Sequence, residues 1–183
     1  MSARSLRLVA ATALASVAVV AVAARPGQAH VATLFGPPWI SIETPVNPYD
    51  ASTRGAFLIV HTFHHGTQLD AAVSGTAEGM VNGDRRTIPL EFSKTSRAGA
   101  YALRKQWGDG GVWTLAILAE QGHGDGAQAL VDIGPTGDVT RVEVPVRYDS
   151  RNGNMPLPRI VSAQELDAAL RLRARTAVAS KGK

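Results

Sequence analysis

Cysteine is absent from the 183-residue sequence, and the absence excludes several classes of protein. Without cysteine there is no disulfide scaffold, no thiolate metal site, no thiol nucleophile and no lipid-anchored cysteine. Any bound metal must therefore be held mainly by nitrogen and oxygen. Charged residues are also few, at 19%, whereas 45% of residues are apolar. This balance predicts a folded chain with one real core and a single domain.

Common catalytic signatures are missing as well. The sequence has no Gly-x-Ser-x-Gly elbow, no phosphate-cradling Gly-Lys-Ser/Thr loop and no dinucleotide fingerprint. Asp109 and Asp125 lie in glycine-rich turns, where an isolated acid usually serves the turn geometry. These absences favour a protein that is not an enzyme.

The net charge of +4 is unevenly distributed along the chain. Residues 1–29 carry three arginines and no acids, and residues 159–183 carry six basic and two acidic residues. The body between them, residues 30–158, has ten basic and thirteen acidic residues. A nucleic-acid-binding domain concentrates lysine and arginine on its own surface, so a nucleic-acid partner is not expected.

Residues 1–29 have the pattern of a signal peptide, expected to be helical. Arg4 and Arg7 precede an apolar run from Leu8 to Ala24, and Gly27-Gln28-Ala29 places small residues at −3 and −1. Cleavage after Ala29 would make His30 the first residue, in the periplasm or outside the cell. Cleavage after Ala23 or Ala24, or retention of the segment as a membrane anchor, are the alternatives.

Residues 30–148 alternate short apolar runs with turn clusters such as Asn82-Gly83. This rhythm predicts an all-β, immunoglobulin-like antiparallel sandwich of seven to eight strands. Trp113, Leu115 and Ile117 share one face of a central strand, which favours a core position. The strands are expected near Trp39 to Glu43, Ala56 to Phe63, Ala71 to Val81, Thr87 to Phe92, Ala100 to Gln106, Val112 to Glu120, Ala127 to Ile133 and Val139 to Val146.

The composition changes after the sandwich. Residues 149–161, which contain Asn152-Gly153 and two prolines, are predicted as a linker. Residues 162–183 are predicted as a short amphipathic helix, reaching about Ala177, and a basic tail. Ser162 and Glu165 form a capping-box pattern, and Leu166 and Leu170 lie one turn apart. Because this apolar face is thin, a solvated tail is the expectation; docking on the sandwich edge, a partner or anionic lipid are alternatives.

Two strand openings carry a resemblance to known families. Gly99-Ala100-Tyr101 and Gly111-Val112-Trp113 match a Gly-x-Tyr strand followed by a Gly-x-Trp strand. Over residues 38–134 the chain resembles periplasmic immunoglobulin-like modules of the YtkA-like and FixH-like families. The resemblance implies a non-catalytic extracytoplasmic module, connected in some relatives with copper delivery or oxidase assembly. It assigns no ligand residue.

His30 is the first candidate metal ligand. At a mature amino terminus, its α-amino and ring nitrogens would form a chelate suited to Cu(II). The arrangement resembles the amino-terminal histidine of CopC-type copper carriers, whose other ligands are an aspartate and a histidine two residues apart. His123 and Asp125 supply these residue types in reversed order. Copper is therefore the cofactor hypothesis.

His61, His64 and His65 form a second candidate cluster, for copper or zinc. On a regular strand His61 and His64 point to opposite faces and cannot chelate together. One interpretation places His61 in the core with Phe57, Ile59 and Phe63. The other turns Leu58, Val60 and Thr62 inward and leaves His61 exposed.

These observations predict an exported, non-enzymatic binding or accessory module with a protein partner. The alternatives are a copper-dependent oxidative enzyme and a membrane-tethered assembly factor that keeps residues 1–29. Membrane contact is expected only if that segment is not cleaved.

Overall fold

The computed structural model describes residues 38–122 and 125–181. The predicted signal segment, His30 and His123 lie outside these ranges. Within them the chain is mostly β-strand and ends in one α-helix, α1 (Ala163–Lys181). None of the described helices is both long and apolar enough to cross a membrane.

The first sheet is antiparallel and has the strand order β1-β2-β7-β6, with β3 paired to β2 at one end. Its strands are β1 (Trp39–Glu43), β2 (Leu58–His64), β3 (Thr67–Gln68), β6 (Phe92–Lys94) and β7 (Ala100–Leu103). A short 3-10 helix, η1 (Ala51–Thr53), lies in the connection between β1 and β2.

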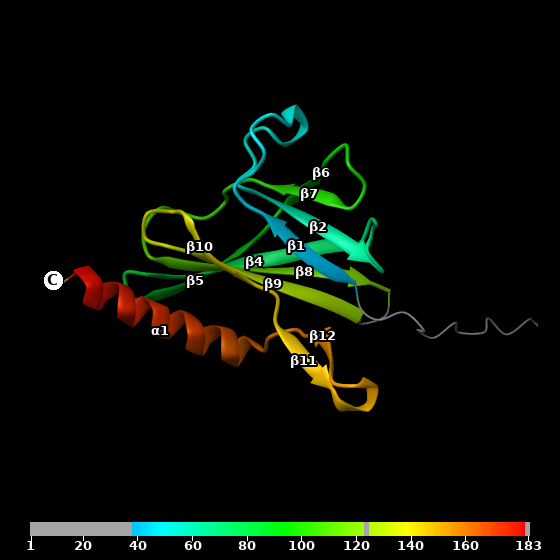
Figure 1. Cartoon of the computed structure of the whole chain (residues 1–183). Coiled ribbons are helices and arrows are strands. Elements are labelled where there is room, and N and C mark those ends of the chain that lie inside the picture. The colour runs from blue at the N-terminus through cyan, green and yellow to red at the C-terminus, as the bar shows by residue number, and fades with distance from the viewer. Residues whose placement is uncertain (1–37, 123–124, 182–183) are drawn as a thin grey trace, which may run out of the picture. The chain divides into compact units, whose positions relative to one another are not determined.

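The second sheet is also antiparallel and has the order β10-β9-β8-β4-β5. Its strands are β4 (Ala72–Val81), β5 (Asp84–Pro89), β8 (Val112–Gln121), β9 (Asp125–Ile133) and β10 (Val139–Glu143). The orders β1-β2-β7-β6 and β9-β8-β4-β5 are similar to the ABED and GFCC′ orders of immunoglobulin-like sandwiches. The predicted all-β fold class is confirmed (Figure 1), but the described residues form twelve strands where seven to eight were expected.

One hydrophobic core joins the two sheets. Leu58, Val60 and Tyr101 from the first sheet belong to the same buried cluster as Leu115 and Ile117 from the second. Trp113 also belongs to it, so the predicted inward face of β8 is confirmed. The alternation of inward and outward residues leaves the outer face of each sheet free to build a site.

Prolines divide two of the predicted strands. The run Thr87 to Phe92 is split between β5, which ends at Pro89, and β6, which begins at Phe92 in the other sheet. Proline cannot donate to a ladder, so the chain leaves one sheet and crosses to the other at this point. Similarly, β10 ends before Pro145, and β11 (Val146–Asp149) forms a separate element.

The predicted linker, residues 149–161, is more structured than its composition indicates. β11 pairs with β12 (Met155–Pro158) around the 3-10 helix η2 (Ser150–Asn152), which forms a two-stranded hairpin. Gly153 at φ 65° and Asn154 at φ 63° supply the left-handed backbone that the turn needs. The turn chemistry was visible in the sequence, but the pairing of its flanks was not.

α1 packs on the outer face of the second sheet, against β4 and β8 (Figure 1). Leu166 and Leu170 are both buried, so the expectation of a solvated tail was wrong for this helix. The predicted capping box is present, because the Ser162 hydroxyl accepts from the Glu165 backbone N–H while the Glu165 carboxylate accepts from the Ser162 backbone N–H. The helix therefore begins at a defined place.

The cap makes the helix sensitive to acid. Hydrogen bonds from Arg159 and from Ser162 lower the pKa of Glu165 from 4.5 to about 2. Because the pKa of Glu165 is lower in the folded state than in the unfolded state, its ionised carboxylate stabilises the fold at pH values above 4.5. This contribution is lost as the pH falls from 4.5 through about 2. We expect Glu165→Gln to be less stable than the parent at pH 7 and equally stable near pH 2, in urea unfolding followed by circular dichroism. A stability difference that does not change with pH would contradict this account.

Candidate functional site

His61 lies on the outer face of the first sheet, because Leu58, Val60 and Thr62 of β2 point into the core. The inward set of the second interpretation is therefore correct, but its expectation that His61 is exposed is wrong. The side chain is nevertheless only 12% exposed, since neighbouring polar groups cover it. Its Nε2 lies 2.8 Å from the Glu43 carboxylate, and its Nδ1 lies 3.1 Å from the Gln68 amide nitrogen. The amide donates to Nδ1, which leaves Nε2 to donate its hydrogen to Glu43.

These contacts belong to a compact ionic cluster. Arg97 donates to Glu43 at 3.5 Å and lies 3.4 Å from Asp50. The hydrogen bond from His61 is the main cause that lowers the pKa of Glu43. Both ring nitrogens of His61 are thus already used, and a metal ion would have to displace Glu43 or Gln68.

Of the remaining candidate metal ligands, only His64 and His65 are brought together in the part of the chain that the structure describes. His64 ends β2 and is on the opposite face from His61, while its ring lies 4.3 Å from that of His65 in the following turn. Asp125 begins β9, whereas His30 and His123 are outside the described residues. Over residues 38–122 and 125–181 no three His, Asp or Glu side chains form a group that could hold a metal. Copper binding through His30 stays a prediction.

A different site lies under α1, and Arg173 fixes one side of it. The Arg173 guanidinium reaches into the outer face of the second sheet, 2.8 Å from the Asp132 carboxylate and 2.6 Å from the Thr114 hydroxyl. It also donates to the backbone carbonyls of Trp113 and Ile133, at 3.0 and 2.9 Å. Burial lowers the pKa of Arg173, and the charge of Asp132 opposes that shift. An arginine stays protonated in this setting, so the contact is a largely buried ion pair.

Arg85 ties the helix to the same sheet at a second point. It bridges Glu78 of β4, at 2.9 Å, and Asp167 of α1, at 2.6 Å. Burial raises the pKa of Glu78, but hydrogen bonds that include those from Thr87 and Arg85 outweigh it, so the pKa is lowered overall. Leu166, Leu170 and these two arginines hold the first half of α1 against the sheet.

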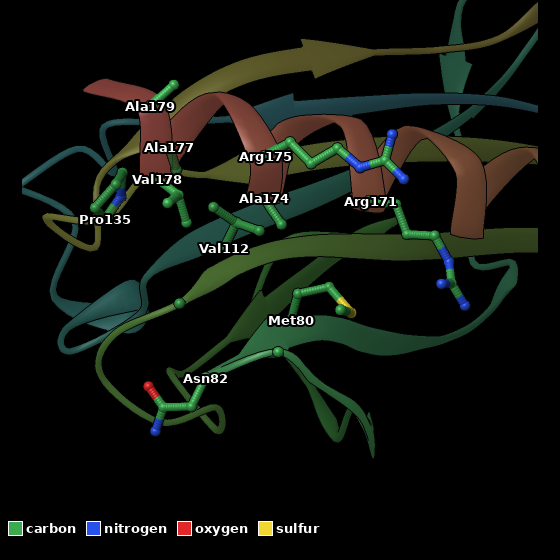
Figure 2. Close-up of a pocket in the computed structure, with 12 residues that line it drawn as sticks. Met80, Asn82, Val112, Pro135, Arg171, Ala174, Arg175, Ala177, Val178 and Ala179 are labelled. Carbon is green, nitrogen blue, oxygen red and sulfur yellow. The ribbon is translucent and has the colours of Figure 1, made fainter. Parts of the chain in front are cut away.

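Beyond these anchors the helix leaves an open groove above the sheet (Figure 2). Its volume is about 670 Å³, within the range of about 300–1,000 Å³ typical of small-molecule sites. Met80 and Val112, which pair across β4 and β8, lie on one side, and Ala174 and Val178 of α1 lie on the other. The full lining consists of Met80, Asn82, Gly83, Gly111, Val112, Pro135, Arg171, Ala174, Arg175, Ala177, Val178 and Ala179.

The groove was not predicted from the sequence, although part of its signal is present there. Ala174, Ala177 and Val178 continue the spacing of Leu166 and Leu170 along the helix. Their small side chains made the stripe look too thin to bury. In the structure these small residues face the sheet and leave the space between the helix and the sheet that forms the groove.

No family model matches the chain, and comparisons with curated proteins and with solved structures give no significant match. A function must therefore be argued from the site and not from the fold, which hosts many unrelated activities.

Proposed function

We propose that this chain is an exported, non-enzymatic binding module whose ligand occupies the groove between α1 and strands β4 and β8. The observation that supports this most is the groove itself, which stays open beside a helix that several anchors hold firmly in place. A preformed concave site with a mainly apolar lining is the usual form of a small-molecule site. Export rests separately on the pattern of residues 1–29.

The chemistry of the lining favours binding over catalysis. Its residues are glycines, alanines, valines, one methionine, one proline, one asparagine and two arginines. None of these described lining residues is a histidine, carboxylate, serine or lysine that could act as nucleophile or general base at neutral pH. Such a lining selects a ligand by shape, apolar area and charge.

A substitution that fills the groove tests the proposal. Ala174 is half-buried in the lining, and Ala174→Phe would occupy the space with a ring while keeping the helix. We expect the neutral, environment-sensitive dye N-phenyl-1-naphthylamine to bind the parent protein saturably, and Ala174→Phe to weaken it about tenfold or more. Fluorescence titration measures both affinities.

Ala169→Phe is the matched control. Ala169 lies on the same helix but is exposed and does not line the groove. The same change there should leave dye affinity and thermal stability close to those of the parent. If the parent, Ala174→Phe and Ala169→Phe all bound the dye equally, the groove would not be the binding site.

A further inference from the structure

The two ends of the groove differ in chemistry. Figure 2 shows the side chains of Arg171 and Arg175 toward one end and Pro135 and Val178 at the other. Met80, Val112 and Ala174 lie between them. Val178 is 74% exposed, so a large apolar side chain stands uncovered at the end away from the arginines. The groove therefore has a cationic end and an apolar body.

The charge at the cationic end is only partly neutralised. Arg171 donates to Asp167 at 2.7 Å, and Asp167 also accepts from Arg85, which in turn reaches Glu78. Two arginines and two carboxylates thus balance each other on this side of α1. Among the described residues no carboxylate pairs with Arg175, which therefore leaves one positive charge at the groove.

We infer that the groove takes a single-chain amphiphile with one anionic head, such as a medium-chain carboxylate; this rests on the proposed function. One unpaired guanidinium matches one anion, and its planar fork suits the two oxygens of a carboxylate. The Arg175 side chain extends toward Arg171 and away from Val178 (Figure 2), and Arg171 and Val178 are seven residues apart, roughly 10 Å along the helix axis. An alkyl chain that extends from the arginine end would cover Met80, Val112 and Val178.

The test compares three ligands that share a ten-carbon chain and differ in the head. Decanoate, 1-decanol and decyltrimethylammonium are titrated below the concentrations at which they form micelles, by displacement of N-phenyl-1-naphthylamine from the full chain. We expect decanoate to bind roughly tenfold or more tightly than the other two, because hydrogen bonds to charged groups are the strong ones.

Two variants assign the preference to the groove. Arg175→Gln should lose the advantage of decanoate while it keeps the affinity for the neutral dye. Arg147→Gln removes a similarly exposed arginine of β11 that does not line the groove, and it should behave as the parent. Ala174→Phe should bind neither dye nor decanoate well.

The outcomes separate the two proposals. Equal affinity for the three heads, with the dye still bound in the groove, would overturn the anionic ligand and leave the binding module standing. Decanoate preference that survives in Arg175→Gln, or decanoate binding that survives in Ala174→Phe, would also overturn it. Association only with micelles or lipid vesicles would replace the single ligand with a membrane surface. Failure of the dye and of decanoate together would remove the proposed function itself.

Discussion

Arg173→Met is expected to lower the free energy of unfolding by about 3 kcal/mol, because it leaves the Asp132 carboxylate without its counter-charge in a largely buried place. The side chain of Asp132 is 11% exposed, and Thr114 would be its only remaining side-chain partner among those described. The methionine keeps most of the apolar stem of arginine, so the loss comes mainly from the charge and its hydrogen bonds. Urea unfolding followed by tryptophan fluorescence measures the change.

A second substitution checks the cause. Asp132→Asn removes the negative charge that Arg173→Met leaves without a partner. The double variant should therefore lose clearly less stability than the sum of the losses in the two single variants. Arg175→Met is the matched control on the same helix, because Arg175 is exposed and should change stability by less than about 0.5 kcal/mol. Equal stability of Arg173→Met and Arg175→Met would show that the buried pair does not hold the helix.

The core of this fold was accessible from the sequence, because alternation encodes it locally. Trp113, Leu115 and Ile117 are spaced by two, and the structure buries all three against the other sheet. The turn signals located most strand ends for the same local reason. Where a proline interrupted an apolar run, the run predicted a single strand. The structure has two strands there, because proline lacks the backbone N–H that would continue the ladder.

The outer faces were harder to predict, because their partners are distant in the sequence. Arg173 meets Thr114 and Asp132, which are 59 and 41 positions away, and nothing local marks these polar strand residues as covered. Polar residues on the outward face of a strand are typical of a strand exposed to solvent. A capped helix with few apolar residues later in the chain is typical of a solvated tail. The docking depends on ion pairs between residues that are distant in the sequence.

The histidines illustrate the same limit at the candidate site. The period of two correctly separated His61 from His64, but it left open which of them faced the core. The inward set was decided by the packing of Leu58 and Val60 against the second sheet. That His61 is held by Glu43 and Gln68 depends on the registers of β1 and β3 with β2, which the sequence does not encode locally.

Gly79→Ala is expected to destabilise the fold by about 1–3 kcal/mol through overpacking, although alanine normally favours a strand over glycine. Gly79 pairs with Trp113 across β4 and β8, and both face the core. A Cβ on Gly79 would lie 2.5 Å from Cε3 of Trp113, closer than carbon atoms can approach. The ring cannot move aside cheaply, because it is buried and its Nε1 donates to the Gly110 carbonyl at 2.9 Å.

Gly108→Ala provides the control, because a Cβ there meets nothing within 4 Å and its φ lies outside the left-handed region. It should leave the unfolding midpoint unchanged or slightly raised. Trp113→Phe replaces the indole with a smaller ring and so relieves the clash that Gly79→Ala creates. The double variant should therefore recover part of the lost stability, with a coupling free energy of about 1 kcal/mol. If Gly79→Ala were as stable as Gly108→Ala, the close approach of β4 to the Trp113 ring would be wrong.

The same pair of strands connects this core contact to the groove. Met80 and Val112 are the next pair along β4 and β8, and they face the groove where Gly79 and Trp113 face the core. Pushing the two strands apart at Gly79 would move the groove lining as well. Gly79→Ala should therefore bind N-phenyl-1-naphthylamine more weakly than Gly108→Ala at a temperature where both remain folded. Unchanged dye affinity would mean that the lining is set by α1 and its anchors alone.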